Sequence, residues 1–367
     1  MVEGSPVEAE HVAERFRWFA RQGCPHLPVY HRLSLGCAAD RDVLRLMVDT
    51  RHRQWRPNLL FAAVHDLLLQ GAPGEIADWY PTIRPEPTPS GDPFPAFRTF
   101  VMEHRTDIVQ ILQARRIQTN EPNRSWLWRL GIPAVTGDLE HPPIALLELG
   151  AAAGLNLAVD RYRYVLNGVS LPDQRSTGPM LSTVDDSGAG RVPLDGPLPR
   201  IVARLGLDLD PASLHNDDDV RWIKACIWPE ELDRHRRFDV AVEMVRRDPP
   251  SVRRDDLVDG LSDAVDELPD GAHLVVVNSW TLTYVDPARR RALETVLELI
   301  GRHRDLSWLS AEANGVVGEL ISVPVNPLDT GTRAVLLARQ WRGGVRHDSV
   351  LASCDPQLAW IDWMAGQ

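Results

Sequence analysis

The sequence predicts an α/β protein in which a doubly wound, mainly parallel sheet follows an all-helical amino-terminal region. Two apolar runs are typical of buried parallel strands: residues 144–149, which are too few for a helix, and the valine-rich run at 273–284. From residue 144 onward, strand-like and helix-like segments alternate, which indicates right-handed crossovers between parallel strands. We therefore expect a helical cap region at 1–135 and a sheet domain at 136–367, with an insertion near 167–250.

The composition is that of a soluble globular protein and disfavours several classes of partner. Its 367 residues, 44% of them hydrophobic and 25% charged, suit one large or two medium domains. No apolar run reaches the roughly 18 residues of a membrane span, and the acidic amino terminus has no apolar stretch typical of a signal peptide. The net charge of −11 disfavours nucleic acid as a partner.

The positions of the cysteine, histidine and lysine residues limit the kinds of disulfide, metal and catalytic site that the chain can form. The four cysteines are scattered and form no CxxC pair, which indicates a reduced, cytoplasmic protein. Cys24 and Cys37 flank His26 and His31, but this spacing matches no common zinc site, so we expect no metal centre. Lys224 is the only lysine and lies outside a GxxxxGK context, which nearly excludes a Walker site or a lysine Schiff base.

The amino-terminal region is predicted to be helical. Apolar periodicity predicts helices at residues 7–22, 40–49, 57–69 and 96–115. The segment from Pro57 is apolar on almost every face, which indicates burial on several sides. His65 lies within it and is either a buried core histidine or a site histidine that faces a cofactor. Residues 81–95 carry six prolines and predict an extended loop.

A polar cluster at residues 116–125 follows the last of these helices and is bounded by apolar segments. Its candidate site residues are Asn120, Glu121 and Arg124, because amides and arginine forks bind carboxylates and orient polar substrates. The same residues are also compatible with a capped helix junction, in which Thr119 or Asn123 is the cap. The sequence leaves both interpretations open.

The carboxyl-terminal part supplies the other predicted elements. Residues 167–199 are rich in Gly, Pro, Ser and Asp and predict a long loop. We expect strands at 162–165, 306–311, 319–325 and 333–341, a short strand or turn at 251–256, and helices at 199–205, 229–247, 257–267, 287–303 and from 217. The last two strands should form an antiparallel pair. Glu312 and Asn314 follow the strand before them.

The stretch Glu148-Leu149-Gly150-Ala151-Ala152-Ala153-Gly154 joins the first strand to a helix-compatible segment. It lacks the G-x-G-x-x-G pattern of dinucleotide sites. It resembles the first motif of class I methyltransferases, E-x-G-x-G-x-G, with Ala152 at the position of the central glycine. The resemblance implies S-adenosylmethionine as cofactor, with Glu148 near its ammonium group and with Gly150 and Gly154 against its methionyl part. It also implies a Rossmann-like, methyltransferase-type sheet.

Two further segments resemble the same enzymes. Residues 275–285, which include Asn278, look like the fourth-strand motif, and the residues after that strand line the methyl-transfer site in those enzymes. Asp256 lies where the family usually has an acid that accepts a hydrogen bond from the adenine amine. The acid that normally follows the second strand and holds the ribose has no clear counterpart, because Asp160 and Asp173 are both misplaced.

The whole chain also resembles a bacterial family of unknown function. The resemblance covers Arg56-Pro57-Asn58-Leu59-Leu60 with Ala63-Val64-His65, then Gln118-Thr119-Asn120-Glu121 with Arg124, and Leu147-Glu148-Leu149-Gly150. It implies that the helical region and the sheet belong to one unit, and it implies no particular activity.

The sequence therefore predicts an S-adenosylmethionine-dependent methyltransferase that acts on a small molecule. Its expected cofactor-binding residues are Glu148, Gly150, Ala152, Gly154, Asn156, Asp256 and Asn278. The expected substrate-side residues are His65, Asn120, Glu121 and Arg124, with Glu121 or His65 as a general base. Two alternatives stay open: the same fold with an altered turn that catalyses elimination, cyclisation or hydrolysis, and a non-catalytic domain that binds a partner protein.

Overall fold

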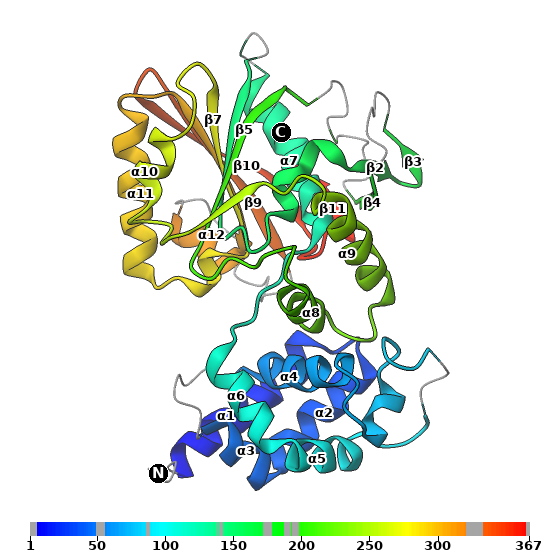
Figure 1. The fold of residues 1–367 in the computed structure, drawn as a ribbon. Helices are drawn as coiled ribbons and strands as arrows, with labels where there is room; N and C mark the ends of the chain where they lie inside the picture. The colour runs from blue at the N-terminus through cyan, green and yellow to red at the C-terminus, as the bar shows by residue number, and fades with distance from the viewer. Residues whose placement is uncertain are drawn as a thin grey trace. The chain divides into compact units, whose positions relative to one another are not determined.

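A computed structural model (Figure 1) describes residues 6–48, 56–85, 89–137, 139, 142–171, 178–186, 192, 198–320 and 333–364. The chain forms two compact units. The helical unit contains residues 1–119 and 216–236, and the sheet unit contains residues 120–215 and 237–367. The segment 216–236 thus returns to the helical unit from the middle of the sheet unit's sequence.

The helical unit is built around an apolar core. Its elements are α1 (Pro6–Trp18), the π-helical turn η1 (Phe19–Gly23), α2 (Pro28–Ala39), α3 (Arg41–Val48), α4 (Pro57–Leu69), the 3-10 helix η2 (Glu75–Trp79), α5 (Phe94–Glu103), α6 (Arg105–Ala114) and α8 (Asp217–Ala225). Helix α4 is buried on most faces, as its apolar composition predicts. The single helix predicted at 96–115 is two helices, which meet at His104.

Hydrogen bonds anchor the segment 216–236 in the helical unit. The Glu230 carboxylate accepts hydrogen bonds from Val29 N and Tyr30 N at 3.1 and 3.3 Å, and so caps the amino terminus of α2. Trp222 Nε1 donates to the Arg116 carbonyl oxygen at 2.8 Å. Because these partners are remote in sequence, the segment joins the helical unit through tertiary contacts.

The sheet unit has a mixed α/β architecture with a mostly parallel sheet. Its strands are β1 (Ile144–Leu149), β2 (Arg163–Leu166), β3 (Val169–Ser170), β4 (Met180–Asp185), β5 (Ile201–Asp208), β6 (Ser251–Arg254), β7 (His273–Ser279), β8 (Leu306–Ala313), β9 (Ala334–Arg342), β10 (Val345–Cys354) and β11 (Trp360–Trp363). In the described residues they form one sheet in the order β3-β2-β4-β11-β10-β9-β8-β7-β1-β5-β6. The block β6-β5-β1-β7-β8 is entirely parallel.

Helices cover both faces of this sheet (Figure 1). The helical elements of the unit are η3 (Pro122–Arg124), α7 (Ser125–Thr136), η4 (Leu155–Arg161), α9 (Leu232–Val245), which begins in the helical unit, α10 (Leu261–Asp266), η5 (Leu282–Tyr284), α11 (Pro287–Gly301) and α12 (Asn314–Leu320). Side chains of α10 and α11 share a core with Trp308 and Val276, whereas α7 places Gly131 against Leu309 on the opposite face. Successive residues of β8 thus face opposite layers.

One element predicted for the sheet unit is wrong, and a second is wrong at its start. Residues 199–205 do not form a helix, because β5 pairs there with β1 and β6 in the interior of the parallel block. The predicted strand at 319–325 is also absent at its start, where residues 319 and 320 end α12; residues 321–325 lie outside the described residues. In the described residues, β9 pairs antiparallel with β8 on one side and with β10 on the other.

The structure also bears on the predicted loop at 167–199, on Cys24, on metal sites and on membrane spans. The predicted loop at 167–199 contains β3 and β4 within its described part. Cys24 Sγ lies 3.4 Å from the Phe19 carbonyl oxygen and is buried. Among the described residues, no group of three or more His, Cys, Asp or Glu side chains could hold a metal ion. No helix in the described ranges is long and apolar enough to cross a membrane.

Candidate functional site

The turn after β1 lies where the strand order reverses. Within the parallel block, the strand that follows β1 is β5, then β6 on the same side, and then β7 on the other side of β1. In open parallel sheets, ligands bind outside the carboxyl ends of the strands at this point. Gly150, Ala152 and Gly154 all have left-handed backbone conformations, with φ of +73°, +51° and +74°. The topology and the turn therefore mark the same candidate site.

The two glycines of the turn are required by close neighbours. A Cβ atom on Gly150 would lie 2.5 Å from Thr281 Cγ2 and still closer to Thr281 Oγ1. A Cβ atom on Gly154 would lie 2.8 Å from Pro250 Cγ. Both positions also have the positive φ that glycine tolerates best. The chain's own packing therefore explains both glycines.

The backbone N–H groups of the turn already have acceptors within the sheet unit. Gly150 N and Ala151 N donate to Leu207 O, Ala152 N to Asp208 Oδ2, Gly154 N to Ala151 O, and Ala153 N and Leu155 N to Asn120 Oδ1, at 2.7 to 3.2 Å. A phosphate site at a glycine-rich turn needs backbone N–H groups that point at the ligand. This turn is therefore a poor cradle for a pyrophosphate.

Glu148, the penultimate residue of β1, has a buried carboxyl with one oxygen that lacks a hydrogen-bond partner among the described residues. Glu148 is 2% exposed, and the oxygen without a partner is Oε2. Burial chiefly raises its pKa to about 8; the Asp208 charge adds to the rise, while the Asn156 hydrogen bond and Arg124 oppose it. A buried carboxyl with an open oxygen favours a ligand that brings a hydrogen-bond donor or a positive charge.

Asn156 is held in the orientation that suits Glu148. Ser125 Oγ donates to Asn156 Oδ1 at 3.0 Å, and the Asn156 side chain hydrogen-bonds the Glu148 carboxyl. Because its oxygen faces Ser125, the amide presents its NH₂ group to Glu148. Ser125, Asn156 and Glu148 therefore form a short chain of hydrogen bonds that joins α7 to the end of β1.

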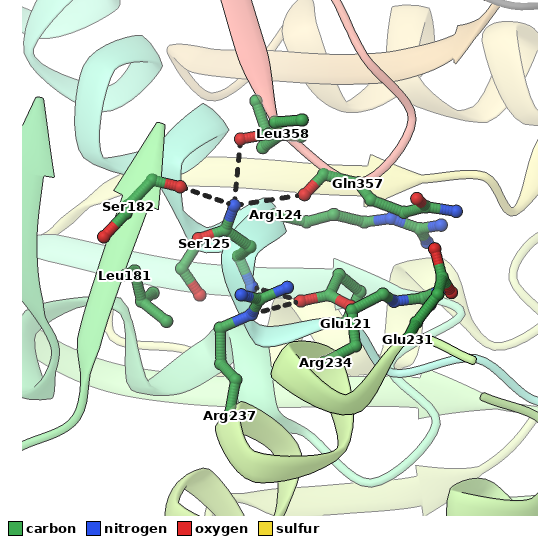
Figure 2. Close-up of polar contacts among 12 residues, drawn as sticks. Glu121, Arg124, Ser125, Leu181, Ser182, Glu231, Arg234, Arg237, Gln357 and Leu358 are labelled. Carbon is green, nitrogen blue, oxygen red and sulfur yellow. Dashed lines mark hydrogen bonds and ion pairs between the residues drawn. The ribbon is translucent and has the colours of Figure 1, made fainter. Parts of the chain in front are cut away.

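Within the polar cluster, residues 121–124 belong to the sheet unit and form hydrogen bonds inside it (Figure 2). Glu121 Oε1 accepts from Asn123 N at 3.0 Å and from Arg237 Nε at 2.9 Å, and the Glu121 side chain is buried. Arg124 Nε donates to the Pro356 carbonyl oxygen at 3.0 Å. Glu121 thus caps η3, as in the capped-junction interpretation, although the sequence suggested Thr119 or Asn123 as the cap.

Asn123 connects three segments. Its Nδ2 lies within 3.1 Å of the carbonyl oxygens of Ser182, Gln357 and Leu358, which come from β4 and from the turn before β11. Asn120 in turn holds the β1 turn through Ala153 N and Leu155 N. The cluster therefore positions the β1 turn, and contact of Asn120, Glu121 and Arg124 with a substrate stays a prediction.

Asp208 is a site residue that the sequence did not reveal. It ends β5, next to β1, and its carboxylate accepts from Ala152 N at 2.9 Å and from Asp210 N at 2.8 Å. Because residues 199–205 were predicted to form a helix, Asp208 was not recognised as the last residue of a strand beside β1. Asp160, by contrast, pairs with Arg204 at 2.7 Å, and Asp173 lies outside the described residues.

Asn278 and Asp256 are engaged with their own neighbours. Asn278 is fully buried in β7, where Nδ2 donates to Ser310 Oγ and Glu312 Oε1, and Oδ1 accepts from Trp308 Nε1. Asp256 accepts from Val258 N and pairs with Arg289; burial opposes the ionised form, but these bonds prevail and lower the Asp256 pKa. Neither residue is brought against Glu148 by a described contact, so their cofactor roles stay predictions.

Glu312, at the end of β8, organises the loop after β7. It is fully buried and accepts hydrogen bonds from Thr281 N, Leu282 N and Thr283 N at 2.7 to 3.2 Å, and from Asn278 Nδ2 at 2.9 Å. Thr281 Oγ1 donates in turn to Leu149 O at 3.0 Å. Glu312 therefore fixes the residue that packs on Gly150. Its place after a predicted strand was the only sequence signal for this role.

His65 belongs to the helical unit and is a buried histidine with both ring nitrogens engaged. Nδ1 lies 3.1 Å from the Ala225 carbonyl oxygen, and Nε2 lies 2.8 Å from Thr82 Oγ1. Burial, and after it the nearby His235, lowers the pKa of His65 to about 3. A neutral imidazole satisfies both contacts, which favours the structural interpretation over a general base.

Replacement of Glu148 by glutamine is expected to change how stability depends on pH. An unfolded glutamate has a pKa of about 4.3, whereas burial raises that of Glu148 to about 8. Below about pH 4 the proton on Glu148 contributes fully to the free energy of unfolding. As the pH rises from about 4 to about 8 this contribution is lost, at up to about 1.4 kcal/mol per pH unit. Urea denaturation from pH 5 to 8 should show this slope in the wild type and its loss in Glu148→Gln. The exposed Glu103→Gln is the control, and equal slopes in wild type and Glu148→Gln would refute the environment inferred for Glu148.

Comparison with known proteins gives a family. The model of one protein family, described as an uncharacterized protein conserved in bacteria (DUF2332), matches residues 13–363. The match spans both structural units. No curated protein matches the chain.

Proposed function

We propose that this chain, which belongs to that bacterial family, is an S-adenosylmethionine-dependent methyltransferase that acts on a small molecule. The observation that carries the proposal is the open, buried oxygen of Glu148 at the strand-order reversal of the parallel block. The α-ammonium group of S-adenosylmethionine is both a hydrogen-bond donor and a cation. It can therefore donate to the open oxygen of Glu148 and also neutralise the carboxylate.

Other groups at the turn suit the same ligand. Asp208, at the end of the neighbouring strand, accepts two backbone hydrogen bonds, and its carboxylate oxygens have lone pairs left for ribose hydroxyls. The turn's N–H groups are used internally, which suits a nucleoside without phosphates better than a dinucleotide. Because Gly150 and Gly154 have no Cβ atom, the backbone of the turn packs closely against Thr281 and Pro250.

The protein's part in such a reaction is orientation and exclusion of water. S-Adenosylmethionine supplies an activated methyl group that needs an in-line acceptor. The buried Glu148–Asn156–Ser125 chain fixes one end of the site, and the Asn120 amide fixes the turn. Rigid positioning by such residues accelerates a displacement without a covalent intermediate. The acidic net charge disfavours a strongly anionic polymer as acceptor.

One observation favours a second candidate. Thr281 occupies the space beside Gly150, and Ala152 N is bound to Asp208. If these contacts persist when ligand is present, the site would hold a smaller amine in place of a nucleoside. The same fold would then catalyse elimination, cyclisation or hydrolysis.

Calorimetric titration with S-adenosylmethionine and S-adenosylhomocysteine distinguishes the two candidates. We expect both ligands to bind the wild type and Asp208→Asn to weaken binding about tenfold, the value of roughly 1.4 kcal/mol for one charge-assisted hydrogen bond. Asp160→Asn is the matched control, because Asp160 pairs with Arg204 away from the turn's hydrogen bonds. Absence of heat and of any thermal shift with both ligands would exclude the methyltransferase proposal.

A further inference from the structure

The two oxygens of the Glu148 carboxyl differ in their hydrogen bonding. Asn156 hydrogen-bonds the carboxyl, and Oε2 has no partner among the described residues. On either side, Glu148 is in register with Val277 of β7 and Gly206 of β5, neither of which has a polar side chain. The two residues in register with Glu148 therefore offer its open oxygen no side-chain hydrogen-bond partner, and the Glu148 side chain is buried.

Four groups with charge or polarity act on this carboxyl from the neighbouring elements. Asp208 at the end of β5 disfavours the ionised form of Glu148, and Arg124 in η3 favours it. Asn156 in η4 also favours the ionised form through its hydrogen bond. Tyr162, just after η4, is buried, and its own pKa is raised first by burial and then by Glu148. A proton on the carboxyl is the simplest way to neutralise it in the ligand-free protein.

We propose that a cationic ligand takes the place of this proton, so that ligand and proton compete for Glu148 Oε2. The carboxylic O–H bond breaks, the proton passes to the buffer, and the carboxylate then accepts a hydrogen bond from the ligand's ammonium group. This inference rests on the proposed function, since it concerns the same site and the same ligand class. It makes binding depend on pH through one residue.

The pH dependence follows from the state of the free protein. The pKa of Glu148 is about 8 without ligand, because the carboxyl is buried. An ammonium or sulfonium cation nearby favours the ionised form and lowers this pKa in the complex. Affinity should therefore increase with pH, approaching tenfold per unit below pH 8, and should level off above it.

Calorimetry in two buffers measures the exchanged proton directly. The wild type is titrated with S-adenosylmethionine at pH 6.5 and 7.2, in phosphate and in imidazole, whose heats of protonation differ strongly. We expect the observed heats to differ between buffers by an amount equal to about one proton released per ligand bound. The affinity should be several-fold higher at pH 7.2 than at pH 6.5.

Two variants separate Glu148 from other titrating groups. Glu148→Gln keeps the size of the side chain but has no proton to release, so its heats should be equal in the two buffers and its affinity independent of pH. Asp160→Asn should release a proton as the wild type does. Wild-type binding with equal heats in both buffers would overturn this inference and leave the proposed function intact. No heat in any buffer would overturn both.

Discussion

Glu312→Ala is expected to destabilise the sheet unit strongly, lowering the free energy of unfolding by about 4 kcal/mol. The variant removes the acceptor of Thr281 N, Leu282 N, Thr283 N and Asn278 Nδ2. Leu282 N and Asn278 Nδ2 are buried, whereas Thr281 N and Thr283 N are partly buried. Each donor that loses its acceptor costs on the order of 1 kcal/mol or more. Urea denaturation followed by circular dichroism measures the loss.

Two further variants test whether the loss comes from the hydrogen bonds that Glu312 accepts. Glu319, in α12, has a half-exposed carboxyl that pairs with Arg290 of α11. Glu319→Ala should cost less than about 1 kcal/mol, as the loss of exposed ion pairs does. Glu312→Gln keeps an acceptor oxygen and should fall between the two. Equal losses for Glu312→Ala and Glu319→Ala would show that the loop after β7 does not depend on the Glu312 hydrogen bonds.

Gly150→Ala is expected to cost about 2–5 kcal/mol. A left-handed backbone costs a residue with a Cβ roughly 1–2 kcal/mol, and overpacking adds about 1–3 kcal/mol. Both terms apply, because φ is +73° and the new methyl group would overlap the Thr281 side chain. Thermal and urea denaturation of the purified variant measure the loss.

Gly168→Ala is the matched control for this substitution. Gly168 has nearly the same backbone, with φ of +78°, but no atom of the described chain lies within 4 Å of its Cβ position. Its loss should therefore be the backbone term alone, about 1–2 kcal/mol. Adding Thr281→Ala to Gly150→Ala should recover part of the stability. Equal losses at Gly150 and Gly168, with no recovery, would contradict the packing described at the turn.

The strands that sequence could predict are those with continuous apolar runs. Strands β1 and β7 are buried on both faces, so nearly every residue is apolar and the pattern is clear. Strand β5 carries Arg204 and Gly206, which interrupt such a run, and its strand conformation depends on β1 and β6 beside it. The error at β5 had a functional consequence, because it concealed Asp208.

The polar cluster could be located from sequence, but its role could not. Its partners are Arg237, Ser182 and the turn at 355–358, which are 59 to 235 residues away along the chain. No local pattern encodes hydrogen bonds of that range. The same limit applies to the segment 216–236, whose place in the helical unit depends on Glu230 and Trp222 reaching residues 29, 30 and 116.

A crystal structure of the protein grown with S-adenosylhomocysteine tests the proposed cofactor site most directly. We expect the ligand at the carboxyl ends of β1, β5 and β7, with its α-amino nitrogen within hydrogen-bond distance of Glu148 Oε2 and its ribose hydroxyls beside Asp208. Ligand bound elsewhere, or a β1 turn that stays closed by Thr281 and Asp208 at saturating ligand, would contradict the proposal.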